Sequence, residues 1–597
     1  AGHLVLGERE FEQSGRVPIE TEKNRIAFAP GADWLWGRAY PEARMHLVTS
    51  TPQAVAALGG DSLLYDDGAS HGAGVATLLS HPTTDLVFAV TGSMTGAAAA
   101  EKLADRYAEG IEQEALLEPA RRFWSHATRD LTLSGDHPDI AAANLLLPWL
   151  AHDAIVHLTV PHGLEQYTGA AWGTRDVCQG PVEFLLAMRH DTAVHRILLA
   201  LFAEQDRKTA DWPQWFMLPP YSSIRAGDAH GDVIIWPLKA LCDYIEASGD
   251  VGILAEKVAW RGGEASTIAD HVAPLIAECE RRFIPGTHLI RYGEGDWNDS
   301  LQPHDPHLRD WMVSSWTAGL LHEQIVRYAA ILERAPENNP PGAGDEAKRL
   351  EKLAAAIRAD FNRHLVAGGI VAGYGLFDHE GHRTELLLHP SDRRTGLSYS
   401  LIAMTEAMLG GLVGETETFQ QLAAIDEALA FPDGYRLMDK PVTYAGGPET
   451  LFRRAESASF FGREIGLMYT HAHLRQSEVL ARLGAADALW QAIALANPIR
   501  VTEVLPSATI RQRNTYFSSS DAAFPDRYAA SRDWQDARTG RVAVDGGWRT
   551  YSSGPGIFTR LLVDLALGLG RRRGAARVLP ASFGKVDVGW TEGSEHL

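Results

Sequence analysis

The stretch Arg291-Tyr-Gly-Glu-Gly-Asp-Trp-Asn-Asp-Ser300 separates two apolar helical segments and cannot itself be a regular helix, because glycines interrupt it. It places Asp296 and Asp299 around Trp297. A flat indole can stack on a sugar ring, and a carboxyl group pressed against an apolar wall is a proton donor near neutral pH. We therefore expect a site for breaking a glycosidic bond. The alternative is a turn in which Asp and Asn bond only the backbone.

Apolar residues with helical periodicity extend far to both sides of this stretch. They mark segments at 139–158, 181–205, 232–248, 266–283, 312–335, 345–365, 396–413, 417–430, 462–483, 486–496 and 556–570. These segments, with one further helix expected, predict a closed α/α toroid over residues 126–575. In such a toroid the inner helices line the centre, and long loops at one end form the site.

The first 95 residues have a different pattern, in which short β-like runs alternate with Gly, Pro and Asp turns. The runs lie at 3–6, 25–28, 45–48 and 86–90. We expect residues 1–95 to form part of a β-sandwich, residues 96–125 a helical linker and residues 576–597 the start of a C-terminal β segment. The predicted fold class is thus mainly α, an (α/α)6 toroid preceded by a partial β-sandwich.

The overall composition excludes several classes of protein. The 597 residues are 45% hydrophobic and 22% charged, as in soluble globular proteins, and the net charge of −21 opposes a nucleic-acid backbone. No apolar run is long enough to span a membrane. Cys178, Cys242 and Cys279 are too sparse for a disulfide framework or a thiolate metal site. We expect a cytoplasmic protein with no metal and no nucleic-acid or membrane partner.

Two further glycine-containing connections carry polar residues in the first half of the helical region. In 166–179, Arg175 and Asp176 could bond adjacent sugar hydroxyls as donor and acceptor, or could simply anchor the loop. In 229–237, Asp232 is a plausible helix N-cap, and His230 could be no more than a turn residue.

Two more such segments lie near the end of the helical region. Residues 461–474 are predicted as a helix in which Glu464 and His471, seven positions apart, share one face. His473 points away from His471, which argues against a two-histidine metal site, so we expect a buried core histidine. In 546–557, hydroxyls, glycine-freed N–H groups and a helix start suit an anion such as phosphate, or form a tight turn without a ligand.

Taken together and in order, these motifs resemble the cellobiose and chitobiose phosphorylase family, glycoside hydrolase family 94, over roughly residues 86–575. The resemblance implies an (α/α)6 barrel in which Asp299 is the general acid. We expect substrate contacts from five residues, namely Arg175, Asp176, Asp296, Trp297 and Glu464. Phosphate ligands are expected at His471, Ser552, Ser553 and Gly554.

This sequence departs from the family pattern mainly where phosphate would bind. Tyr551 stands where the family has glycine, Pro555 interrupts the helix start, and Gln166 or Tyr167 occupies the place of the family's phosphate arginine. The segment 179–181 also lacks a further aspartate of the family. The family's N-terminal sandwich is longer than 95 residues, so we expect a fragment of a longer protein.

These observations lead us to expect an inverting phosphorylase that cleaves a β-glucoside to α-glucose 1-phosphate. Its partners would be an oligosaccharide or disaccharide and inorganic phosphate as co-substrate, with no other cofactor, and the resemblance suggests a homodimer. The first alternative is an inverting hydrolase whose base lies roughly 6.5–9.5 Å from the acid. Glu464, Asp521 and Asp545 are the candidates for that base. The second alternative is a carbohydrate-binding toroid without catalysis, or a module of a β-glucan-synthesising protein.

Overall fold

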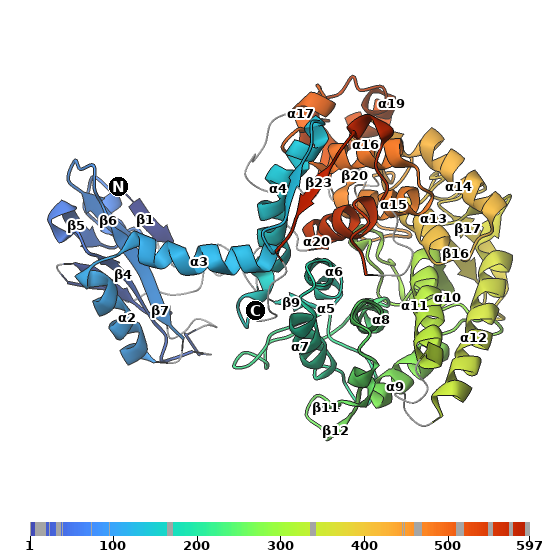
Figure 1. Cartoon of the computed structure of the whole chain (residues 1–597), viewed down its shortest axis with the longest axis horizontal. Helices are drawn as coiled ribbons and strands as arrows, with labels where there is room; N and C mark the ends of the chain where they lie inside the picture. Colours follow the sequence, from blue (N-terminus) through green and yellow to red (C-terminus); the bar gives the residue numbers. More distant parts are fainter. Residues whose placement is uncertain are drawn as a thin grey trace. The chain divides into compact units, whose positions relative to one another are not determined.

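The computed structural model divides the chain into two compact units, Ala1–Arg122 and Phe123–Leu597 (Figure 1). The division falls inside helix α3 (Gln113–Thr128). The structure describes residues 2–5, 19–22, 24–31, 37–38, 40–72, 75–94, 96–163, 171–334, 342–444, 446, 448–458, 468–508, 519–546, 553–571 and 577–591. The boundaries predicted at residues 95, 125 and 575 remain predictions.

The first unit contains two antiparallel sheets that share a small core. One sheet has the order β2 (Ile19–Thr21), β3 (Arg25–Phe28), β4 (Arg44–Thr49), β7 (Phe88–Ser93), and the other has the order β1 (Gly2–Val5), β6 (Val75–Ser80), β5 (Val55–Gly59). The core consists of Ile26, Phe28, Leu47, Ala76 and Leu78, which come from both sheets. Helix α2 (Ala97–Glu109) packs on β4 and β7. Four of these strands, β1, β3, β4 and β7, overlap the predicted β-like runs.

The second unit is built on six inner helices that contact one another in a closed ring (Figure 1). Around the ring they are α6 (Gly180–Ala187), α8 (Trp236–Ser248), α11 (Ser315–Arg334), α13 (Leu401–Leu409), α15 (Thr470–Arg482) and α20 (Ser553–Arg560). The ring closes where α20 meets α6. A Cβ atom at Gly556 would lie 1.8 Å from the carbonyl oxygen of Gly180, so only glycine permits this contact.

A second helix precedes each inner helix in the sequence. These are α4 (Pro138–Ile155), α7 (Asp191–Phe202), α9 (Ile268–Arg281), α12 (Ala343–His364), α14 (Glu415–Ala428) and α16 (Ala486–Ala496). These six helices lie outside the ring because each can bury only one face. Helix α12, for example, buries Leu350, Ala354, Ile357 and Phe361 at helical spacing and packs on α11. By contrast, every residue of α6 is buried. The predicted toroid of inner and outer helices is therefore present.

Short elements fill the connections between the helices. The helices are α5 (Thr174–Val177), α10 (Pro306–Trp311), α17 (Val501–Val504), α18 (Arg527–Arg532) and α19 (Trp534–Arg538). The strands are β8 (Thr132–Ser134), β9 (Trp172–Gly173), β10 (Trp215–Phe216), β11 (Lys257–Ala259), β12 (Ala265–Thr267), β13 (Met312–Ser314), β14 (Val366–Ala367), β15 (Ile370–Val371), β16 (Tyr374–Phe377), β17 (Arg383–Leu387), β18 (Ala430–Phe431), β19 (Gly434–Tyr435), β20 (Met468–Tyr469), β21 (Ser519–Ala522), β22 (Val544–Gly546) and β23 (Asp587–Gly589). Strand β23 pairs with β8.

Three predicted helices differ from the structure. The segment 181–205 is two helices, α6 and α7, because the chain turns at Arg189, whose φ is +59°. This break supplies the twelfth helix. Within the described part of the segment 462–483, Met468–Tyr469 is extended and pairs with β21, and the helix begins at Thr470. The segment 556–570 starts at Ser553 and continues as a π-helical turn over Leu561–Ala566.

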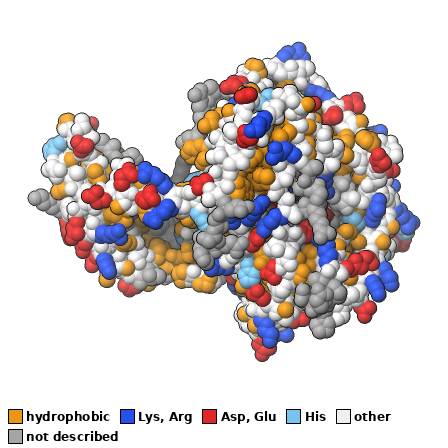
Figure 2. Space-filling view, viewed as in Figure 1, with side chains coloured by type: hydrophobic (Ala, Val, Ile, Leu, Met, Phe, Trp, Pro, Cys, Tyr) orange, Lys and Arg blue, Asp and Glu red, His pale blue; other side chains and the backbone are white. Residues whose placement is uncertain are grey.

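The surface carries charges of both signs. Figure 2 shows Lys and Arg side chains interspersed with Asp and Glu over the visible face. Among the described residues, no helical segment combines the length and the apolar character that a membrane span requires.

Candidate active site

The loop 291–300 is held by backbone contacts that depend on glycine. Gly293 and Gly295 have φ values of +65° and +127°, which favour glycine. The N–H of Gly231 donates to the carbonyl oxygen of Gly295 at 2.8 Å. A Cβ atom at Gly231 would lie 2.3 Å from the carbonyl oxygen of Tyr292. The loop is thus locked against the segment that leads into α8.

Asp296 anchors this loop from inside. Its side chain is fully buried, and its two oxygens accept hydrogen bonds from the Ser314 hydroxyl at 2.6 Å and from the N–H of Asn298 at 2.9 Å. Burial raises the pKa of Asp296 to about 7. No part of this side chain is exposed, and a contact between Asp296 and the substrate remains a prediction.

Asp299 is the carboxylate of the loop that remains accessible. Its side chain is 24% exposed and accepts a hydrogen bond from the Arg175 guanidinium at 3.0 Å. His230 lies on the same oxygen, with 3.4 Å between Nδ1 and Oδ1. The Arg175 guanidinium therefore orients Asp299, and the His230 ring lies beside the same carboxylate oxygen.

His230 is held in one tautomer by its own partners. The Gln302 amide nitrogen lies 2.7 Å from Nε2, and Nδ1 lies 3.2 Å from the carbonyl oxygen of Asp296. Burial, reinforced by the charge of Arg175, lowers the pKa of His230. The ring is thus neutral, accepts at Nε2 and donates from Nδ1. Beyond a place in the turn, the ring thus links Gln302 to the loop that carries Asp299, and the structural reading of His230 remains a prediction.

Arg175 is buried between carboxylates. In addition to Asp299, its guanidinium lies 3.5 Å from Asp232, whose other partner is the indole N–H of Trp236 at 2.8 Å. Burial lowers the pKa of Arg175, but the carboxylates of Asp232 and Asp299 outweigh it and raise that pKa. Asp232 does occupy a helix N-cap position, yet its side chain caps no N–H and instead pairs with Arg175. Arg175 thus bonds protein carboxylates here, as in the loop-anchoring alternative.

Asp176, the second member of the predicted Arg-Asp pair, is half-buried and lies against Gly173. A Cβ atom at position 173 would lie 2.3 Å from the Asp176 carboxylate. Burial raises the pKa of Asp176 and outweighs the charge of Arg175, which lowers it. Its contact with a sugar remains a prediction.

Trp297 and His471 form the second part of the site. The indole N–H of Trp297 donates to Nδ1 of His471 at 3.2 Å, and the two rings meet edge to face with centroids 4.7 Å apart. Tyr469 packs on the same indole at 5.1 Å. Trp297 is only 8% exposed, so stacking on a sugar ring remains a prediction.

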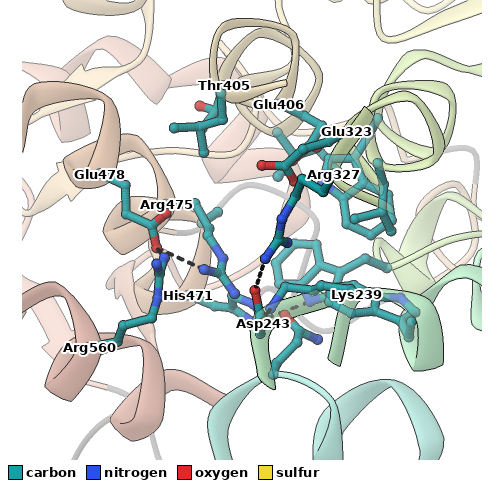
Figure 3. Close-up of a pocket in the computed structure, with 18 of the residues that line it drawn as sticks. Lys239, Asp243, Glu323, Arg327, Thr405, Glu406, His471, Arg475, Glu478 and Arg560 are labelled. Atoms are coloured by element: carbon teal, nitrogen blue, oxygen red, sulfur yellow. Dashed lines mark hydrogen bonds and ion pairs between the residues drawn. The ribbon is translucent and has the colours of Figure 1, made fainter. Parts of the chain in front are cut away.

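A cavity of about 60 Å³ extends from these two rings between the inner helices (Figure 3). Its lining includes the aromatic rings of Trp236, Trp297, Trp316 and His471. The polar and charged residues of the lining are Gln179, Lys239, Asp243, Glu323, Arg327, Thr405, Glu406, Arg475, Glu478, Arg482 and Arg560. Trp236 connects the two parts of the site, because its N–H bonds Asp232 while its ring lines this cavity.

Several charged residues of the cavity lining belong to one ion network that is centred on Glu183. Glu183 is 1% exposed and pairs with Lys239, Arg475 and Arg560 at 2.5–2.8 Å. Glu478 also pairs with the two arginines. Burial raises the pKa of Glu183, but its three cations outweigh this and hold the pKa well below the ordinary value. Four inner helices, α6, α8, α15 and α20, are thereby joined across the centre.

Sequence reasoning missed this network and the role of His230. One signal was available: charged residues such as Glu183 and Lys239 interrupt helices that are otherwise apolar. Such residues are seldom buried unless they are paired. The partners themselves lie far apart in sequence and could not be assigned.

The predicted phosphate segment is described only in part. Ser553 and Gly554 are buried in the first turn of α20. Ser552, Tyr551, Glu464, Gln166 and Tyr167 lie outside the described residues. Positions Asp521 and Asp545 face each other across β21 and β22, but their side chains are not described.

His473 is confirmed as a core histidine. It is fully buried, accepts from the N–H of Tyr435 at 3.1 Å and donates to the carbonyl oxygen of Ala492 at 2.8 Å. Within the described ranges, no group of three or more His, Cys, Asp or Glu side chains could hold a metal ion.

Comparison with known proteins relates the chain to oligosaccharide phosphorylases, although no protein-family model matches it. It is 42% identical over 476 residues to a 1,2-β-oligoglucan phosphorylase of Listeria innocua, which covers 78% of this chain and 43% of that protein. It is 27% identical over 272 residues to a 3-O-β-D-glucopyranosyl-β-D-glucuronide phosphorylase of Paenibacillus borealis, covering 45% of this chain and 32% of that protein. The predicted resemblance to glycoside phosphorylases is thereby confirmed.

Two other comparisons are more distant. A cyclic β-(1,2)-glucan synthase of Rhizobium meliloti is 23% identical over 480 residues, covering 77% of this chain and 16% of that protein. The chain thus spans less than half the length of these curated relatives. Among solved structures, a bacterial glucoamylase complexed with acarbose matches with a TM-score of 0.55 at 11% identity, over 92% of this chain and 74% of that one. This match shows the shared fold alone.

Proposed function

We propose that this chain, a relative of the glycoside phosphorylases, cleaves a β-1,2-linked glucooligosaccharide with inorganic phosphate and releases α-glucose 1-phosphate. The observation that carries the proposal is the 42% identity over 476 residues to a 1,2-β-oligoglucan phosphorylase. The proposal is also supported by Asp299, a carboxylate that can act as a general acid and that is 24% exposed on the loop 291–300. The linkage rests on two relatives whose names specify β-1,2-glucans.

Asp299 is the proposed general acid. It gives its proton to the glycosidic oxygen while a phosphate oxygen forms the new bond to the anomeric carbon from the opposite face, so the configuration inverts. The incoming phosphate carries its own charge, and no second catalytic carboxylate is needed.

Arg175 has two roles in this scheme. Its guanidinium bonds the carboxylate of Asp299, which is the base required in the reverse reaction, when an acceptor hydroxyl attacks glucose 1-phosphate. In the forward direction, sugar hydroxyls take over part of the Arg175 hydrogen bonding and Asp299 holds its proton. Asp176 and Glu464 are proposed as further sugar ligands.

Phosphate is proposed to lie between His471 and the start of α20. His471 supplies a neutral imidazole, because burial and then the charge of Arg475 hold the pKa of this histidine well below its ordinary value. Ser552, Ser553 and Gly554 supply hydroxyl and N–H donors at a helix N-terminus, where the helix dipole favours an anion.

The location and further assembly of the chain belong to the same proposal. All three cysteines are buried and free of disulfides, which fits the proposed cytoplasmic location. The (α/α)6 barrel is proposed as the catalytic domain of a family 94 enzyme, preceded by the partial β-sandwich and the helical linker, and a homodimer is proposed from the resemblance.

The test is release of glucose 1-phosphate from β-1,2-, β-1,3- and β-1,4-linked glucose disaccharides, with and without phosphate. We expect phosphate-dependent release from the β-1,2 substrate, and a loss of about a thousandfold or more in Asp299→Asn, since the proton donor is removed. Asp310→Asn, an exposed aspartate of helix α10, is the matched control and keeps its activity.

Two other outcomes would refute the proposal. Free glucose at a rate indifferent to phosphate would indicate the inverting hydrolase. Sugar binding that persists in Asp299→Asn, with no turnover in the unmodified chain, would indicate a carbohydrate-binding module of a larger glucan-synthesising protein.

A further inference from the structure

The hydrogen bond between Trp297 and His471 determines which nitrogen of His471 carries the proton. The indole N–H can only donate, and it lies 3.2 Å from Nδ1 of His471. Nδ1 must therefore present its lone pair. On a neutral imidazole the single proton is then on Nε2.

The surroundings of His471 keep the ring neutral. The side chain is 5% exposed and lies one helical turn before Arg475, whose charge faces the same cavity (Figure 3). The charged groups that act on it are Arg475 of α15, Glu183 of α6, Arg175 of α5 and Lys239 of α8. Burial and the three cations lower the pKa of His471 and outweigh Glu183, which raises it, so Nδ1 stays unprotonated and the indole bond is kept.

Phosphate distinguishes between the two tautomers. Its oxygens carry the negative charge and accept hydrogen bonds, so they are attracted to an imidazole N–H and repelled by an imidazole lone pair. A histidine that faces phosphate with Nε2 binds only when Nε2 carries the proton. Within the described part of the chain, the structure gives Nε2 no hydrogen-bond acceptor that would compete.

We propose that Trp297 is a positioning residue, whose indole N–H holds His471 as the Nε2–H tautomer and thereby prepares it to donate to phosphate. This inference rests on the proposed function for the identity of the anion. It gives the indole a role at its N–H edge, whereas the family resemblance implies that the ring face stacks on a sugar.

The packing of the indole supports this role. Its ring makes two edge-to-face contacts. One is with Tyr469, at an interplanar angle of 82°, and the other is with His471 itself, at 81°. Only 8% of Trp297 is exposed. The imidazole orientation is therefore set by a group that is itself immobilised by packing.

The first experiment reads the tautomer directly. ¹⁵N NMR of the protein labelled in the histidine rings separates protonated from unprotonated ring nitrogens, and the His471 signals are those missing from His471→Ala. We expect a single neutral Nε2–H tautomer in the unmodified chain. A protonated Nδ1 or a charged ring would overturn the proposal, without any need for a Trp297 variant to fold.

The second experiment separates positioning from sugar stacking. Trp297→Phe keeps a ring but removes the N–H, so we expect the KM for phosphate to rise about three- to tenfold, the usual effect of one hydrogen bond. The KM for the oligosaccharide should change less than about twofold. Trp260→Phe is the matched control, because Trp260 is also buried, at 5% exposed, and also loses an indole hydrogen bond, to Ser266 at 3.0 Å, but does not line this cavity; both KM values should stay unchanged.

The outcomes of this comparison are distinct. A rise in the oligosaccharide KM alone would mean that Trp297 stacks on sugar and would overturn the proposal. In a His471→Ala background, Trp297→Phe should raise the phosphate KM no further; an undiminished effect there would also overturn it. The NMR experiment needs no turnover, so it tests the tautomer of His471 even if the chain shows no phosphorolysis. An absence of phosphorolysis would refute the proposed function and leave the tautomer unaffected.

Discussion

Replacing the buried carboxyl of Asp296 by an amide should change how the stability of the protein depends on pH. Asparagine has the same shape and can still accept from the N–H of Asn298, while its amide donates to the hydroxyl of Ser314. These are the two short contacts of Asp296, at 2.9 and 2.6 Å. The substitution therefore removes a titratable group with little change in packing.

The size of the effect follows from the shift in pKa. Burial raises the pKa of Asp296 from 3.8 to about 7. Between these values the folded protein keeps the proton while the unfolded chain loses it, so the free energy of unfolding falls as the pH rises. Each unit corresponds to about 1.4 kcal/mol. The two units between pH 5 and pH 7 thus amount to about 3 kcal/mol, with no further change above pH 7.

The assay is urea unfolding at pH 5 and pH 8, followed by tryptophan fluorescence. The free energy of unfolding of Asp296→Asn, relative to that of the unmodified chain, should rise by about 3 kcal/mol from pH 5 to pH 8. Asp310→Asn, which removes an exposed carboxyl, should show no such gain. If the two proteins differ in free energy of unfolding by the same amount at pH 5 and at pH 8, the argument that burial raises the pKa of Asp296 is refuted.

The same variant also tests which carboxyl donates the proton. A pKa of about 7 would suit a general acid, but the side chain of Asp296 is fully buried. We expect Asp296→Asn to keep its turnover within about tenfold, as for a residue that only supports the loop. A loss as large as that of Asp299→Asn would move the catalytic role to Asp296.

Three further predictions concern the structures around the site. Gly231→Ala should lower stability by about 1–3 kcal/mol in thermal unfolding and reduce turnover, because its Cβ would lie 2.3 Å from the Tyr292 carbonyl oxygen; wild-type behaviour would show that the loop can shift. Glu183→Gln should cost about 3–5 kcal/mol in urea unfolding, since three buried cations lose a shared partner, whereas exposed Glu351→Gln should be neutral; equal effects would contradict a structural network. Arg175→Lys should reduce kcat more than about tenfold, because a single ammonium cannot bridge both carboxylates, and unchanged kcat would show that the bridge is dispensable.

The sequence by itself determined the helices and the loop that carries the acid. Periodic apolar residues located the helices of the toroid because burial of one face is encoded locally, at spacings of three and four residues. The glycines at 293 and 295 predicted an irregular loop for the same kind of reason, since positive φ values are a property of single residues. His473 was assigned to the core from its position on the helix, and the structure agrees.

Only the tertiary structure decided which side chains meet at the site. Arg175 and Asp299 are 124 residues apart, and Trp297 and His471 are 174 residues apart. Their contacts exist because the ring of helices closes and brings the connections between helices together, and no local pattern encodes the pairing. The fate of the two aspartates in one short motif shows the consequence. Asp296 faces inward and is fully buried, whereas Asp299, three residues later, is 24% exposed, and the local sequence does not encode that difference.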